Sequence, residues 1–79
     1  LTGHSDRVTA LEFRSDGGVL ATGGADQTIR LWSVANGNLL DTLKDNTAIV
    51  TVIRFSPDGR ILATGSNDNV IRVWYPDSN

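Results

Sequence analysis

Residues 13–32 read FRSDGGVLATGGADQTIRLW, and residues 55–74 read FSPDGRILATGSNDNVIRVW. The second stretch lies 42 places after the first, since 74 − 32 = 42, and 11 of the 20 aligned residues are identical. A fixed period of this length is typical of solenoids and propellers, in which one supersecondary unit stacks on its own kind. The repeat therefore predicts two copies of one unit, packed against each other.

Short runs of β-branched, aromatic and other apolar residues fill each copy, and turn residues separate them. Runs of this kind predict β-strands. Asp-Gly and Asn-Gly pairs between the runs favour tight hairpins and hence antiparallel sheets. In the first run, regular alternation predicts that Val8 shares a face with Ala10 and Glu12. The seven expected strands are residues 7–14, 19–23, 28–33, 39–43, 49–55, 61–65 and 70–75.

Composition excludes several classes of function. The 79 residues carry a net charge of −2, no cysteine and a single histidine, so we expect no disulfide, no metal site and no cofactor. Acidic and basic residues are interspersed, which argues against a nucleic-acid partner or an anionic membrane. No apolar run is long enough for a transmembrane helix. The lack of cysteine weakly favours an intracellular location, and nothing else in the sequence indicates the compartment.

Several marker residues occur at family-specific spacing. Gly3-His4 precedes the first strand, and Phe13-x-x-Asp16-Gly17, Leu20-Ala21-Thr22-Gly23, Asp26 and Trp32 follow it. Together they resemble a WD-repeat β-propeller, over essentially the whole chain. There are departures: serine and tyrosine follow the two tryptophans in place of aspartate, and Asp45-Asn46 stands where the second copy would carry Gly-His.

The resemblance implies an all-β fold of four-stranded antiparallel blades around a central channel. We expect residues 1–79 to be part of one propeller, with residues 1–43 as a first blade. Residues 44–79 would then form a second blade that lacks its outer strand. The chain begins with leucine and contains no methionine, so we interpret it as a segment of a longer protein.

The resemblance also implies a buried hydrogen-bond network that links Asp26, His4, Thr22 and the Trp32 indole. The second copy keeps the equivalents of three of these residues, with Asn46 in place of histidine. Alternatively, the histidine, the aspartate and the threonine hydroxyl could form a hydrolytic triad with threonine as the nucleophile. The sequence, however, shows no accessible site and no oxyanion loop. We therefore expect a structural role and no catalysis. The second-copy residues are Thr64, Asp68 and Trp74.

In this family the usual partner surface is formed by the loops around one mouth of the channel. The motif places six positions of this chain there, and we expect them to be exposed. Ile49 among them could be an apolar anchor for a peptide. Alternatively, it packs on the neighbouring blade or fills the place left by the missing histidine network. The six positions are Arg7, Thr9, Ala25, Ile49, Thr51 and Asn67.

The leading hypothesis is a non-catalytic scaffold that presents propeller loops to protein or peptide partners, alongside further propeller blades. The alternative is a self-associating unit in which identical chains close a six- or eight-bladed ring. A third possibility is a propeller that regulates a neighbouring domain of the same protein. Fold alone does not choose among these, because propellers serve many functions.

Overall fold

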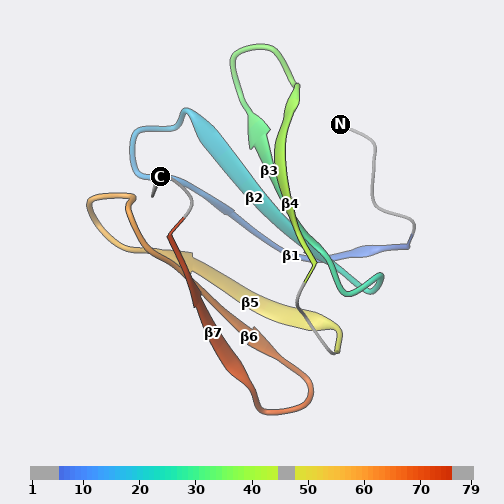
Figure 1. Cartoon of the computed structure of the whole chain (residues 1–79). Coiled ribbons are helices and arrows are strands. Elements are labelled where there is room, and N and C mark those ends of the chain that lie inside the picture. Colours follow the sequence, from blue (N-terminus) through green and yellow to red (C-terminus); the bar gives the residue numbers. More distant parts are fainter. Residues whose placement is uncertain (1–5, 45–47, 76–79) are drawn as a thin grey trace.

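The computed structural model of the chain describes residues 6–44 and 48–75 (Figure 1). These residues form two antiparallel sheets and no helix, with strand orders β1-β2-β3-β4 and β5-β6-β7. The predicted all-β fold, with a four-stranded unit followed by a three-stranded one, is confirmed. The strands are β1 (Val8–Phe13), β2 (Val19–Gly24), β3 (Ile29–Ser33), β4 (Leu39–Leu43), β5 (Val50–Phe55), β6 (Leu62–Ser66) and β7 (Ile71–Trp74).

The five hairpin turns within the two sheets share one local device. In each turn an Asp or Asn side chain accepts the backbone N–H of the residue two places on, at 2.9–3.2 Å. The residue between them has a φ of 65–75°. Side chains of this kind stabilise such turns by imitating a backbone acceptor, which explains why the chain reverses at these places. The accepting residues are Asp16, Asp26, Asn36, Asp58 and Asp68.

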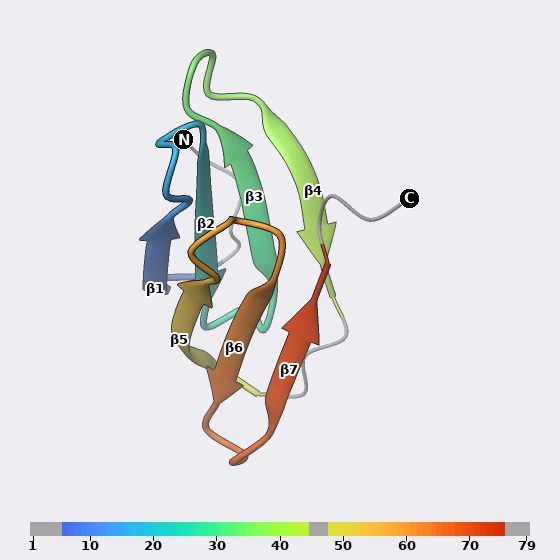
Figure 2. The same cartoon turned by 90° about the vertical axis from the view of Figure 1, so that its left-hand side faces the viewer.

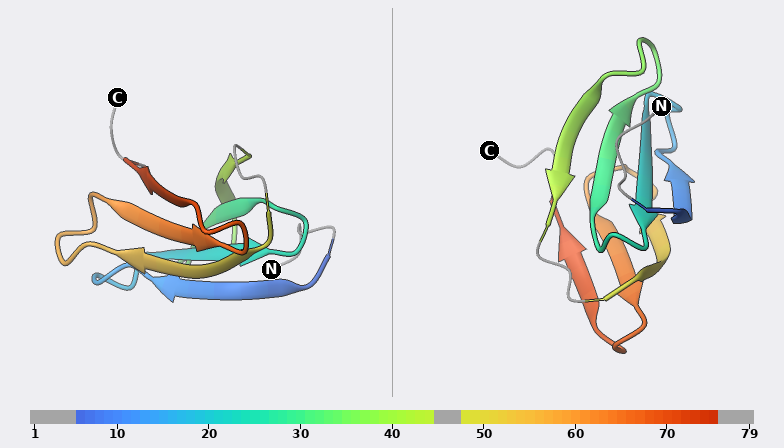
Figure 3. Two further views of the ribbon diagram at one scale, coloured as in Figure 1. Left: turned by 90° about the horizontal axis from the view of Figure 1, so that it is seen from below. Right: turned by 90° about the vertical axis from the view of Figure 1, so that its right-hand side faces the viewer.

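The two sheets lie face to face, as Figure 2 shows, with β5 packed against β1 and β2. Their shared core draws on β2 and β3 from the first sheet and on β5 and β6 from the second, so neither sheet buries its apolar face alone. Seen from below in Figure 3, the two sheets form successive layers. The buried cluster consists of Ala21, Ile29, Leu31, Val50, Ile53 and Leu62.

The outward faces of this stack repeat the two faces that meet inside it. Ile53 is 3% exposed between the sheets, whereas its equivalent 42 places earlier, Leu11, is 59% exposed on the far side of the first sheet. Ile29 is fully buried, whereas its equivalent Ile71 is 76% exposed on the far side of the second. Each outward face therefore carries the same apolar positions as one of the two faces that pack together between the sheets. A further sheet of the same kind would fit against it in the same way.

The start of β1 departs from the expected alternation. A β-bulge lies between Val8, which pairs with Gly24, and Ala10, which pairs with Gly23. Neighbouring residues of β2 point to opposite faces, so Val8 and Ala10 do too, and the prediction that they share a face is wrong. The extra residue is Thr9. The second sheet repeats this bulge at the start of β5.

Candidate functional site

One edge of the stack carries the starts of β1 and β5 together with the turns that follow β2 and β6. We call this the candidate edge; it lies towards the lower right in Figure 1. The N–H of Ala25 donates to the Arg7 carbonyl at 2.9 Å, and the N–H of Asn67 donates to the Ile49 carbonyl at 3.1 Å. The same bond thus recurs 42 places on. It fixes each turn against the segment that enters the first strand of its sheet.

The six predicted partner residues all lie at this edge, but they differ in exposure. Arg7, Thr51 and Asn67 are exposed, as expected. Ala25 and Ile49 are half-buried, because the bonds just described draw the turns and the strand starts together.

Thr9 departs furthest from the expectation of an exposed contact residue. Its side chain is half-buried, and its hydroxyl donates to the carbonyl of Val50 in the second sheet. The same hydroxyl lies 3.3 Å from the Gly23 carbonyl in its own sheet. Thr51, its equivalent, stays exposed with its hydroxyl 3.2 Å from the Gly65 carbonyl. Thr9 therefore joins the sheets.

Two residues that the sequence reasoning missed lie at the tips of this edge. Gln27 and Asn69 have φ values of 68° and 65°, and both are exposed. Side chains larger than hydrogen rarely adopt this left-handed backbone, and such outliers collect at functional positions. The other positive-φ residues among those described are glycines. The sequence did carry a signal for this backbone conformation. Gln27 and Asn69 directly follow the turn aspartates Asp26 and Asp68, just as Gly17 follows Asp16.

Each tryptophan is held by a threonine of the neighbouring strand. The indole Nε1 of Trp32 donates to Thr22 Oγ1 at 2.8 Å, and both residues are buried. In the second sheet, Trp74 Nε1 donates to Thr64 Oγ1 at 3.2 Å, and Trp74 is only half-buried. The two tryptophans also differ in strand neighbours: β4 pairs with the outer edge of β3, whereas β7 has no such neighbour among the described residues.

Asp26 and Asp68, expected in the same network, take part in turns. Asp26 Oδ1 accepts the Thr28 N–H at 3.2 Å and the Thr28 hydroxyl at 2.8 Å. Asp68 Oδ1 accepts the Val70 N–H at 3.2 Å. His4 and Asn46 lie outside the described residues, so the histidine step of the network stays a prediction.

The geometry gives the hydrolytic alternative no support. The hydroxyl oxygen of Thr22 accepts the Trp32 indole N–H, and Thr22 as a residue is only 7% exposed, which leaves little approach for a substrate. Within residues 6–44 and 48–75, no group of three or more His, Cys, Asp or Glu side chains could hold a metal ion. The same residues contain no helix that is long and apolar enough to cross a bilayer.

The opposite edge of the stack carries the turns at residues 15–18 and 57–60, on the left in Figure 1. The Ser15 hydroxyl donates to the Pro57 carbonyl, its equivalent 42 places on, at 3.0 Å. Arg14 donates to both carboxylate oxygens of Asp16, at 2.9 and 2.8 Å, and this bond is the main cause that lowers the Asp16 pKa. The Ser56 hydroxyl likewise lowers the pKa of Asp58.

Comparison with known proteins agrees with this architecture. The family model "WD domain, G-beta repeat" (WD40) matches residues 1–33 and 37–75. An uncharacterized WD repeat-containing protein of Synechocystis sp. is 47% identical over 47 residues, which are 58% of this chain and 14% of that protein. Eukaryotic translation initiation factor 3 subunit I of Phaeosphaeria nodorum is 48% identical over 47 residues, 60% of this chain and again 14% of the relative.

The solved structure of U3-55K superposes with a TM-score of 0.93 at 27% identity, covering 96% of this chain and 25% of that one. The chain thus spans a small part of each of these three proteins. Two repeats, two blade-like sheets in sequence order and the match to the family model lead to one conclusion. The chain belongs to the WD40 repeat family of β-propeller proteins.

Proposed function

We propose that this chain is a non-catalytic interaction scaffold, which presents its candidate edge to a protein or peptide partner. Residues 1–43 and 44–79 would serve as successive blades of one propeller. WD40 proteins generally act as scaffolds, and the relatives include proteins named as subunits, of translation initiation factor 3 and of a guanine nucleotide-binding protein. Further blades would cover the two open faces.

The observation that carries this proposal is the pre-organisation of the candidate edge. Its turns are tied to the strand starts by repeated backbone bonds at Ala25 and Asn67. At its tips, Gln27 and Asn69 share a left-handed backbone conformation, which costs free energy for a side chain such as glutamine and less for asparagine. A rigid surface loses little conformational freedom when it binds, so this edge is suited to a partner of defined shape.

Within the edge, the structure favours different roles for the six predicted residues. The exposed side chains of Arg7, Thr51 and Asn67 are free to meet a partner. Ile49 is half-buried, which favours a role in packing against neighbouring residues of the edge over a role as an exposed anchor for a peptide. The remaining two residues, Thr9 and Ala25, shape the edge through their hydrogen bonds.

Site-specific photo-crosslinking tests the proposal. A photoreactive amino acid at position 67 should give adducts with a partner in the source cell, and Arg7→Glu should reduce their yield. The control is the same photoreactive group at the exposed Asn38, in the turn between β3 and β4 away from the candidate edge. Equal adducts from both positions, or adducts from Asn67 that Arg7→Glu leaves unchanged, would contradict the assignment of this edge.

Gln27→Gly tests independently whether the Gln27 side chain belongs to the binding surface. Glycine adopts the positive φ at no steric cost, so the variant should be as stable as the parent or more so. If Gln27 contacts the partner, the variant should nonetheless give fewer adducts from Asn67. Undiminished crosslinking by a stable Gln27→Gly protein would remove Gln27 from the binding surface.

The expected absence of a nucleic-acid partner stays a prediction. In its support, two of the basic side chains are matched by acids: Arg14 pairs with Asp16, and Arg54 Nη1 lies 3.8 Å from a Glu12 carboxylate oxygen. The alternative of a ring closed by identical chains draws no support from the comparisons, in which this chain matches parts of longer single chains.

A further inference from the structure

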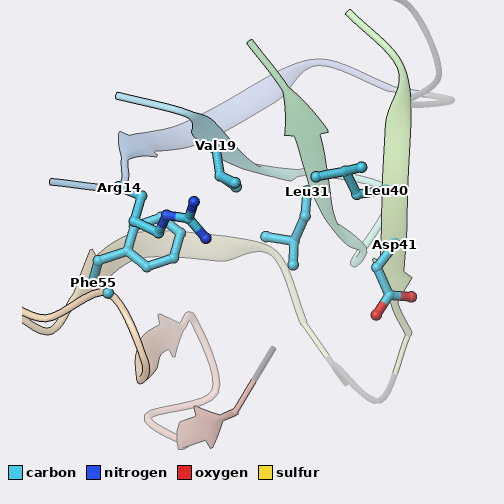
Figure 4. Close-up of a pocket in the computed structure, with 7 residues that line it drawn as sticks. Arg14, Val19, Leu31, Leu40, Asp41 and Phe55 are labelled. Atoms are coloured by element: carbon cyan, nitrogen blue, oxygen red, sulfur yellow. The ribbon is translucent and has the colours of Figure 1, made fainter. Parts of the chain in front are cut away.

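A pocket of about 130 Å³ lies between the two sheets, away from the candidate edge (Figure 4). Its lining combines apolar side chains with two charged groups, Arg14 and Asp41, which Figure 4 shows on opposite sides of it. Its volume approaches that of a cavity that takes up one benzene molecule, about 150 Å³. It therefore suits a single side chain. The apolar lining residues are Val19, Leu31, Leu40, Phe55 and Gly59.

The pocket depends on an irregularity in β4. Leu31 pairs with Asp41 and Trp32 pairs with Leu39, which leaves Leu40 as an extra residue. In a regular strand, successive side chains point to opposite faces, so Leu40 and Asp41 would not line one pocket. The bulge brings both to it, and bulges often re-aim side chains near binding sites.

Gly59 completes the wall on the Arg14 side. A Cβ atom at Gly59 would lie 2.8 Å from Arg14 Cδ and 2.9 Å from Cγ, so only glycine lets the Arg14 stem lie across this turn. The φ of +75° at Gly59 favours glycine for the same position. The guanidinium of Arg14 is turned to the Asp16 carboxylate, which balances its charge.

Asp41 is the second charged residue that lines the pocket, and it is exposed. Its carboxylate accepts the N–H of Thr42 at 2.8 Å and has no cationic partner among the described residues. We propose that this pocket binds a side chain with an aliphatic stem and a cationic tip, a lysine or arginine of a partner protein. The stem lies against the apolar wall formed by Leu31, Leu40 and Phe55, and the tip pairs with Asp41. This site is separate from the candidate edge.

An NMR titration of the protein with small probes tests this inference. Butylammonium reproduces a lysine side chain, butanol removes its charge and butyrate reverses it. We expect butylammonium to shift the backbone amides of Leu31, Leu40 and Gly59, and to bind about three- to fivefold more tightly than butanol, as for a partly exposed ion pair. Butyrate should bind most weakly of the three probes.

Variants assign the preference to one carboxylate. Asp41→Asn keeps an oxygen for the Thr42 N–H and should abolish the difference between butylammonium and butanol. The control is Asp6→Asn, the same change at an exposed residue beside the candidate edge, which should retain the difference. Equal binding of butylammonium and butanol by the parent would overturn the inference, as would tighter binding of butyrate or shifts spread beyond the pocket.

Discussion

The two sheets approach each other closely at Gly23 of β2, and an added methyl group there should force them apart. A Cβ atom at Gly23 would lie 2.6 Å from Val50 Cγ1, 2.9 Å from Val50 Cβ and 3.1 Å from Ile53 Cδ1. Val50 is fully buried and Ile53 is 3% exposed, so neither side chain has room to withdraw. Overpacking of this kind costs about 1–3 kcal/mol. For a domain of this size, each kcal/mol lowers the melting temperature by about 4–8 °C.

The chain contains its own control 42 places on. A Cβ atom at Gly65 would meet only Val52 Cγ1, at 2.9 Å, and the Val52 side chain is 45% exposed and can turn away. Alanine also favours a strand over glycine by about 0.5–1 kcal/mol, so Gly65→Ala should change stability little. Urea unfolding, followed by the combined fluorescence of Trp32 and Trp74, measures both variants. Equal losses of unfolding free energy in Gly23→Ala and Gly65→Ala would refute the packing of the sheets described above.

Two further predictions concern the tryptophans and pH. Trp32→Phe leaves the buried Thr22 without its indole donor, and should lower the unfolding free energy by about 1–3 kcal/mol. Trp74→Phe, at a half-buried site, should lower it less, and thermal unfolding would reveal a reversed order. Arg14 lowers the Asp16 pKa below 3.8 in the folded protein, so the stability that this pair contributes is present above that pH and is lost in more acid solution. Asp16→Asn should therefore lose less stability than the parent between about pH 6 and pH 3; an identical loss in urea unfolding would contradict this.

The strands and turns could be predicted because their signals are local. Asp-Gly pairs and short β-forming runs fixed where the chain reverses, and the observed strands begin and end within a residue or two of the expected positions. The repeat predicted the stacking, since two similar units each need cover. The resemblance to a propeller family added the order of the strands in space.

The features that were missed depend on contacts between strands. Whether Val8 shares a face with Ala10 is decided by a bulge that the residue pattern does not reveal. Thr9 is half-buried because its hydroxyl donates to a carbonyl of the second sheet, and the pocket beside Asp41 depends on the bulge in β4. The left-handed backbone at Gln27 escaped notice because glycine is the usual marker of that conformation.

The central claim is that the two repeats form separate sheets in direct face-to-face contact. Its most direct test is a nuclear Overhauser measurement between the α-protons of Gly23 and the methyl groups of Val50. The contact at this point predicts a strong cross-peak, because a Cβ added to Gly23 would lie 2.6 Å from a Val50 methyl carbon. Val50 methyl protons with cross-peaks only to residues of their own sheet would contradict it.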